Sequence, residues 1–401
     1  MDKVSQVKGK VFCEIDPIKT RIIEISDALH ANPEIGHQEH KAAELLTSEL
    51  ERHGFKVEKH IAGMPTAFKA TYQGMSETPI VAFLAEYDAL PGLGHGCGHN
   101  LIAAISVGAA IALSKVMPEL PGTLVVFGTP AEEAGVDNAG GKVIMIDEIK
   151  RVDAAMMVHP SDRTVVDSVS IAREALEFEF IGKAAHAASA PHEGINALDG
   201  VMLTFTALNA LRQHVKPGVK IHGIITKGGV APNIVPDHAI ARIYVRAADR
   251  ETLKETVERV KNCARGASLA TGAKVNIRNY ANTYENMVTN RALAEVFKKN
   301  LLELGVEVKE PKKDVGVGST DMGNVSHVVP AIHPYIKIGP EGLPGHSLEF
   351  AKASATEEAH NAAITAIKAL TMTTIDLFTS PELMKKVKQE FAEAKKEAKS
   401  Q

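Results

Sequence analysis

The apolar segments of this chain change character near residue 174, and this change constrains the fold more than any other feature. Before it, short strands read as continuous apolar runs, in PIVAFLAEY, TLVVFGTP and DAAMMVHP. Such runs are typical of strands that are buried on both faces, and here they alternate with helical patterns. We therefore predict an α/β sheet with helices on both faces. At the N-terminal end, we predict a helix from residue 18, a turn near NPEIG and a second helix that stops at Gly54.

The segments after residue 174 follow another pattern. ALEFEFIGK alternates apolar and polar residues, and the order to residue 287 is strand, helix, strand, strand, helix, strand. This is the split βαβ order of a ferredoxin-like unit, and helical patterns resume after Met287. We predict a large α/β domain in two parts, 1–173 and 288–401, with a smaller α+β domain inserted at 174–287.

Length, charge and cysteine usage narrow the functional class. A chain of 401 residues is too long for a single hydrophobic core of ordinary size, which indicates two domains. A net charge of -4 argues against a general binder of nucleic acids or anionic membranes. No apolar run approaches the roughly 20 residues of a spanning helix, and the N-terminus lacks an apolar signal core. The three cysteines form no disulfide framework, so we expect a cytoplasmic protein.

Metal-ligand side chains follow three of the predicted strands. The first strand leads into GLGHGCGHNL, in which four glycines allow sharp turns around a cysteine and two histidines. The residues concerned are Asp88, Cys97, His99, Glu132, Glu133 and His159. Strand ends of an open α/β sheet meet at one edge, and thiolate, imidazole and carboxylate groups bind zinc or similar ions. We predict a metal site there, with Asp88 orienting a ligand and one of the paired glutamates free to act as a base.

Each of these residues also has an ordinary explanation. A single histidine after a strand is more often a surface or core residue than a ligand, and adjacent glutamates suit the start of a helix. Cys97 fits a small buried apolar residue, or a redox thiol, although no Cys-x-x-Cys motif accompanies it. The meeting of all of them at one edge favours the metal site.

Longer motifs make the chain similar to a known family. LHANPEIGHQE, AEYDALPGLGHGCGHNL, TPAEEAG, MMVHP, GKAAHAASAPHEGINAL, APNIVPD and LPGHSLEF stand in the family's order. The chain resembles the dimetal amidohydrolases and peptidases that include aminoacylases, glutamate carboxypeptidases and p-aminobenzoyl-glutamate hydrolase. It looks closest to the branch of p-aminobenzoyl-glutamate hydrolase and aminoacylase-like dipeptidases. The resemblance implies an α/β protein with a large mixed-sheet metallohydrolase domain and an inserted ferredoxin-like dimerisation (lid) domain.

The resemblance also implies roles for individual residues. It implies two divalent ions, zinc or manganese, held by Cys97, His99, Glu133, His159 and His346. It makes Glu132 the general base and Asp88 the residue that orients a ligand. His186 would reach into the active site of a second copy of the chain and stabilise the oxyanion, which implies a homodimer. Asn233, Arg246 and Asp321 would contact the substrate, with the arginine on a carboxylate. The chain departs from many peptidase members at Glu86, where they carry histidine, and at Asn100, where relatives often have aspartate.

The resulting hypothesis is a cytoplasmic, metal-dependent hydrolase of a small amide substrate. A metal-bound water attacks the carbonyl and Glu132 moves the proton. The substrates left open are p-aminobenzoyl-glutamate, N-acyl amino acids, and β-alanyl or γ-linked dipeptides. The alternatives are a catalytically silent binding protein on the same fold, which would have no need of Glu132, and thiol redox chemistry at Cys97.

Overall fold

The structure is a computed structural model that describes residues 3–133, 135–167, 169–311 and 318–400. Within these residues, the chain divides into two compact units. The first contains residues 1–169, 287–316 and 324–401, and the second contains residues 170–286 and 317–323. Each unit is built around its own hydrophobic core.

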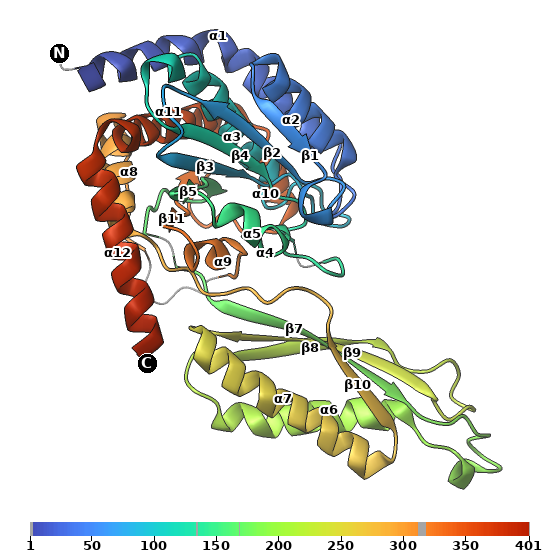
Figure 1. Cartoon of the computed structure of the whole chain (residues 1–401). Helices are drawn as coiled ribbons and strands as arrows, with labels where there is room; N and C mark the ends of the chain where they lie inside the picture. The colour runs from blue at the N-terminus through green and yellow to red at the C-terminus, as the bar shows by residue number, and fades with distance from the viewer. Residues whose placement is uncertain (1–2, 134, 168, 312–317, 401) are drawn as a thin grey trace. The chain divides into compact units, whose positions relative to one another are not determined.

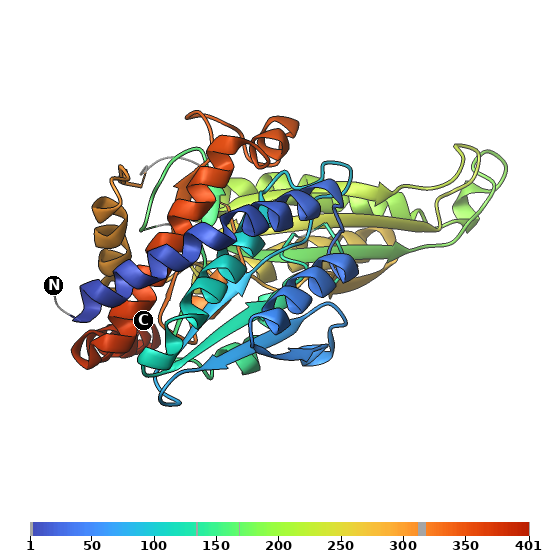
Figure 2. The same ribbon diagram turned by 90° about the horizontal axis from the view of Figure 1, so that it is seen from above.

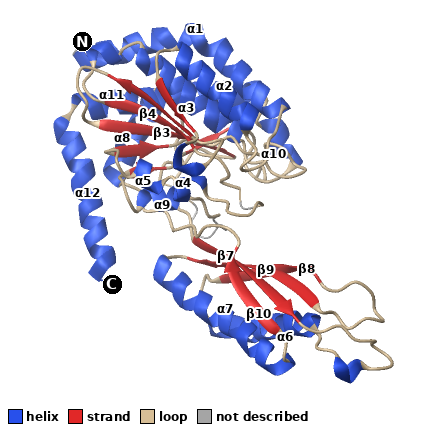
Figure 3. Ribbon diagram, turned by 45° about the vertical axis from the view of Figure 1, so that its right-hand side comes forward, coloured by secondary structure: helices blue, strands red, loops and turns tan. Residues whose placement is uncertain are grey.

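The first unit is built on a six-stranded mixed sheet with the order β1-β2-β4-β3-β5-β11. The strands are β1 (Lys56–Lys59), β2 (Phe68–Gln73), β3 (Ile80–Ala85), β4 (Thr123–Gly128), β5 (Ala154–Met156) and β11 (Ala331–Ile332). The four strands β4, β3, β5 and β11 run parallel, whereas β2 pairs antiparallel with β4 and with β1 (Figures 1 and 3). A separate parallel pair joins β6 (His159–Ser161) to β12 (Tyr335–Lys337). The predicted α/β fold with a large mixed sheet is confirmed.

Helix α3 (His99–Ser114) lies at the centre of this unit. All of its 16 residues are buried, and its alanines and single glycine let its neighbours approach closely. It packs on β3 and β4 and against α1 (Lys3–Ala31) and α11 (Glu357–Thr379), which lie beside it in Figure 2. The other helices are α2 (His40–Arg52), α4 (Gly141–Ile144), α5 (Ile146–Ile149), α8 (Arg291–Glu303), α9 (Met322–Ser326), α10 (Leu348–Ala353) and α12 (Pro381–Ser400).

Two expectations about helices need correction. Helix α1 begins at Lys3, not near residue 18, because its apolar stripe continues toward the N-terminus on the far side of Pro17. This proline is exposed, and so is Cys13, whose backbone carbonyl the proline leaves without an N–H donor. Helix α11 is long and apolar enough to cross a membrane by length and composition, contrary to the expectation from the sequence, but 72% of that window is buried in the structure. A helix that is apolar on most sides is then a core helix.

The second unit has the β-α-β-β-α-β order expected from the sequence. Its elements are β7 (Ala172–Ile181), α6 (Ala197–Leu211), β8 (Lys220–Lys227), β9 (His238–Ala247), α7 (Arg250–Thr271) and β10 (Lys274–Asn279). The four strands form an antiparallel sheet of order β10-β7-β9-β8. Figure 3 shows α6 and α7 along one side of this sheet. The described residues 318–323 also belong to this unit, outside the range 174–287 that the sequence pattern outlined.

Candidate metal centre

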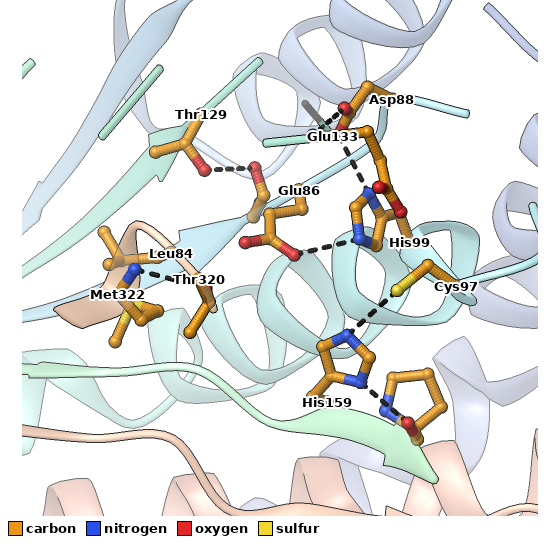
Figure 4. A network of polar contacts seen from close by, with 12 residues as sticks. Leu84, Glu86, Asp88, Cys97, His99, Thr129, Glu133, His159, Thr320 and Met322 are labelled. Carbon is orange, nitrogen blue, oxygen red and sulfur yellow. Dashed lines mark hydrogen bonds and ion pairs between the residues drawn. The ribbon is translucent and has the colours of Figure 1, made fainter. Parts of the chain in front are cut away.

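The ligand-type side chains of the first unit lie where its parallel strands end. Strand β3 is hydrogen-bonded to β4 on one side and to β5 on the other, all in the same direction. The residues that follow these strands therefore leave the sheet at one edge. Figure 4 shows that several of those labelled, Glu86, Asp88, Glu133 and His159, gather around Cys97 and His99.

Asp88 ties two of these segments together. The His99 Nδ1–H donates to Asp88 Oδ1 at 2.8 Å, and the backbone N–H of Glu133 donates to Oδ2 at 2.8 Å. Both side chains of the Asp88–His99 pair are almost wholly buried. Burial opposes the charged forms, but the neighbouring charges prevail: His99 lowers the pKa of Asp88, while Glu86 and Asp88 raise that of His99 well above its usual value. Nδ1 is thus occupied, and Nε2 faces the site.

Cys97 and His159 form the second contact. Cys97 Sγ lies 3.4 Å from His159 Nε2, and the His159 Nδ1–H donates to the carbonyl of Pro160 at 2.7 Å. Burial favours the neutral thiol, but His159 and His99 together hold the pKa of Cys97 well below its usual value. A thiolate is the form of cysteine that binds metals.

His346 approaches from the loop before α10 and is the exposed member of the set. Its side chain is 57% exposed, and its Nε2 lies 3.3 Å from Glu133 Oε1. Its backbone N–H donates to the carbonyl of Gly96 at 2.9 Å, and its φ of 56° is in the left-handed region. Burial and the nearby thiolate raise the pKa of Glu133 to about 7, and contacts with Cys97 and Glu133 raise that of His346 to about 11.

These donor atoms fit a pair of metal ions. Three groups, Cys97–His99–His159, Cys97–Glu133–His346 and His99–Glu132–Glu133, each offer ligand atoms within 4.8 Å of one another. Among the described residues, His99 Nε2 and Glu133 Oε1 are buried without a hydrogen-bond partner. Each lies 3.3 Å from an oppositely charged group, Glu86 for His99 Nε2 and His346 for Glu133 Oε1, with a geometry short of a hydrogen bond. A bound metal ion would satisfy both atoms. A thiolate, imidazoles and carboxylates are the donor set that zinc and similar ions accept.

Two left-handed backbone positions hold these ligands in place. Gly98, the residue before α3, has a φ of 77°, and a Cβ there would lie 2.5 Å from Pro160 Cγ. Ala131 has a φ of 56° and donates its N–H to the buried carboxyl of Glu39 at 2.8 Å. These residues shape the segments that carry Cys97, His99 and the paired glutamates.

Four predicted residues belong to the second unit. His186 and Asn233 are exposed and lie on segments paired through their backbones, where the N–H of Ala187 donates to the carbonyl of Asn233 at 3.0 Å. Arg246, on β9, donates to Ser319 Oγ at 2.9 Å, which gives that serine a contact that the sequence did not suggest. Asp321 is buried and has polar contacts of its own.

Four further residues lie around the site without a predicted role. The Lys142 ammonium is fully buried and paired with Glu86, whose other oxygen lies 3.3 Å from His99 Nε2. The rings of His333 and Tyr335 lie 5.4 and 5.3 Å from that of His159. The sequence could have indicated His333 and Tyr335, because AIHPY follows a short apolar segment. Lys142, in GGKV, belongs to no pattern of metal-ligand residues.

The chain is similar to known hydrolases along most of its length. The model of a family described as Peptidase family M20/M25/M40 matches residues 82–372. An Xaa-Arg dipeptidase from Mus musculus is 38% identical over 402 residues, covering 96% of this chain and 92% of the relative. A component of the p-aminobenzoyl-glutamate hydrolase of Escherichia coli K12 is 29% identical over 454 residues, covering 94% and 93%. A crystal structure of an aminobenzoyl-glutamate utilization protein from Klebsiella pneumoniae superposes with a TM-score of 0.75 at 17% identity, covering 92% and 99%, which supports the fold.

Proposed function

Because the chain belongs to the peptidase family M20/M25/M40, we propose that it uses divalent metal ions to hydrolyse the amide bond of a dipeptide or small N-acyl amino acid. The observation that carries the proposal is the convergence of donor atoms at the ends of β3, β4 and β5. Two of them, His99 Nε2 and Glu133 Oε1, are buried without a hydrogen-bond partner within the described residues. A silent binding protein on this fold would not need them.

The residues of the chain divide the work as follows. Cys97, His99, Glu133, His159 and His346 would hold the metal ions. When bound, such ions lower the pKa of a water molecule and polarise a carbonyl group. Asp88 keeps the Nδ1 proton of His99 away from the metal side. Glu132, buried and within 4.8 Å of His99 and Glu133, takes a proton from the attacking water and passes it to the leaving amine.

The relatives suggest the substrate class. At 38% identity over nearly the whole chain, the resemblance to an Xaa-Arg dipeptidase supports a dipeptide with a C-terminal basic residue. The resemblance to p-aminobenzoyl-glutamate hydrolase supports an acyl-glutamate as the next candidate. In either case, we propose that Arg246 holds the substrate carboxylate, because a guanidinium fork suits that group. The thiolate at Cys97 favours zinc over manganese.

A substrate panel tests this function. Metal-depleted protein would be assayed with zinc, with manganese and with chelator, on Xaa-Arg dipeptides, β-alanyl dipeptides, N-acyl amino acids and p-aminobenzoyl-glutamate. We expect metal-dependent release of an amino acid from one of these classes, and loss of at least about 100-fold in turnover with Glu132→Gln. Glu119→Gln, an exposed carboxylate paired with Lys10, is the matched control and should leave turnover unchanged. Full turnover in Glu132→Gln would disprove the mechanism.

We further propose a homodimer formed through the second unit, with His186 acting in the site of the other copy. Strand β8 is an edge strand, and its Ile224 and Ile225 are 64% and 45% exposed. An edge strand with exposed apolar side chains is a natural pairing surface. Light scattering on the purified protein should give twice the mass of the chain, and Ile224→Arg should give a monomer. Mixing His186→Ala with Glu132→Gln should restore part of the activity if the histidine acts across the dimer, and none if it acts within its own chain.

A further inference from the structure

Glu86 and Lys142 form a buried ion pair beside the proposed metal site. Glu86 follows β3 directly and is 1% exposed, and Lys142, on α4, is fully buried. The Lys142 ammonium contacts Glu86 Oε1. Charges are seldom buried this deeply unless they are paired, because removing them from water costs several kcal/mol for each ion.

The second oxygen of Glu86 points into the site. Oε2 is buried, lies 3.3 Å from His99 Nε2, and makes no hydrogen bond among the described residues. His99 Nε2 makes no hydrogen bond there either, so the contact between the two atoms is an ion pair without hydrogen-bond geometry. Figure 4 shows the two groups facing each other across the edge of the sheet.

The 3.3 Å separation between these two atoms matches that of two ligands on one ion. Two atoms that each lie about 2.1 Å from a tetrahedral ion are about 3.3–3.4 Å apart. The same spacing joins His346 Nε2 to Glu133 Oε1, in the set already assigned to the metals. Glu86 also has an oxygen within 4.8 Å of one from Glu132, so it faces the proposed base as well as the proposed ligand.

We propose that Glu86 is an additional ligand of the metal ion bound by His99, and that Lys142 is a positioning residue for it. Lys142 occupies Oε1 and thereby directs Oε2 toward the ion. Its positive charge also balances Glu86, so that the extra carboxylate does not leave the site with a surplus of negative charge. This inference rests on the proposed metal-dependent function.

Metal affinity tests this inference without any substrate. Metal-depleted full-length protein would be titrated with Zn²⁺ in competition with a chromophoric chelator, and the Co²⁺ form would be examined by visible absorption. We expect two ions for the unmodified protein. Glu86→Gln should weaken one of them by about 10–100-fold and leave the other unchanged. The Co²⁺ spectrum should change in intensity, because the coordination number of one ion falls.

Two further variants keep the result clear. The control is Glu49→Gln. Glu49, on α2, is another buried carboxylate and pairs with Arg21 on α1, so this change should leave both metal affinities unchanged. If Glu86→Gln does not fold, Glu86→Asp keeps the charge beside Lys142 but withdraws the oxygen, and should weaken the same ion. If Glu86→Gln has wild-type affinity and an unaltered Co²⁺ spectrum, the inference is overturned but the proposed function stands. The same holds for Glu86→Asp where that variant is used instead. Absence of any bound ion in the unmodified protein would overturn the proposed function as well.

Discussion

The proposed site has a buried half and an exposed half, and the two are built differently. In the buried half, Asp88 and His99 are 1% exposed or less, and each has partners from other segments. In the exposed half, the His346 side chain is 57% exposed, and the residue lies in a loop with a left-handed φ. The buried half is held by hydrogen bonds between separate segments, whereas His346 is held by its backbone hydrogen bond to Gly96 and by contacts close to solvent. Stability and metal affinity should therefore respond separately to changes in the two halves.

The largest expected effect is a difference in unfolding free energy between variants of the buried half and of the exposed half. In metal-free protein, His99→Ala leaves Asp88 as a buried carboxylate without its partner and should cost about 3–5 kcal/mol of unfolding free energy. His346→Ala removes a side chain that is 57% exposed, so solvent screens its contacts with Cys97 and Glu133, and it should cost less unfolding free energy than His99→Ala. Urea unfolding with chelator present measures both. Equal costs for the two variants would show that the halves do not differ as described.

The next effect concerns the backbone of the buried half. Gly98→Ala places a Cβ 2.5 Å from Pro160 Cγ at a φ of 77°. It should cost about 3 kcal/mol, from strain and crowding together. Gly92→Ala has a similar φ of 71° but open space around it, so strain alone should cost about 1 kcal/mol. Thermal unfolding compares the pair, and a Gly98→Ala protein as stable as Gly92→Ala would contradict close packing at the site.

A smaller effect should appear in metal affinity. Asp88→Asn presents an amide to Nδ1 of His99 and favours the tautomer with its proton on Nε2, facing the metal. We expect Zn²⁺ affinity to fall about 10–100-fold, which corresponds to about 1.4–2.7 kcal/mol. Asp153→Asn is a suitable control, because this aspartate accepts the backbone N–H of Ile80 at the opposite end of the same strand, at 2.7 Å. Unchanged affinity in Asp88→Asn would remove the orienting role.

The last effect is a pH dependence of the Glu39 carboxyl, which lies behind the buried half and accepts the backbone N–H of Ala131. Burial and the charge of Asp88 raise the pKa of Glu39 from 4.5 to about 8. A carboxyl with a raised pKa in the folded state contributes its stability below the unfolded pKa and loses it as pH rises to the folded value. The contribution of Glu39 to the stability of the metal-free protein should therefore fall from about pH 4.5 to about pH 8, by at most about 1.4 kcal/mol for each unit of pH.

Glu39→Gln should flatten this fall in a series of urea unfolding curves. Glu49→Gln is the contrast, since Arg21 lowers the pKa of Glu49 against the effect of burial, and its loss should leave the fall in place. A fall of the same steepness in Glu39→Gln would assign the pH dependence to another group.

The sequence predicted the fold and the buried half better than the surroundings of the site. Parallel strands whose ends meet at one edge can be recognised from apolar runs, and Asp88, His99 and Glu133 come shortly after such runs. His346 required the family resemblance, because its loop has no periodicity that would relate it to Glu133, more than 200 residues earlier. The resemblance marked Glu86 as a departure from the family, but neither kind of reasoning paired it with Lys142. A lysine after two glycines suggests a surface loop, and only the folded chain shows that it is buried.

The start of α1 was misjudged for a related reason. Pro17 suggests a helix boundary when only local rules apply, yet the apolar stripe of Val11, Ile15 and Ile22 continues past it and is buried. Tertiary packing here outweighs the local preference. Neither the short strands β11 and β12 nor the pairing of β12 with β6 could be recognised, since two or three residues give no measurable alternation.

Asp88 has a consequence for inhibitors. Because one of its oxygens holds the ring of His99 and the other holds the backbone of Glu133, a displacement of either residue is transmitted to the other. A compound that displaces the 129–133 segment outward would also rotate the imidazole of His99. One bound compound would thereby disturb two metal ligands. Such a compound would need no chelating group of its own.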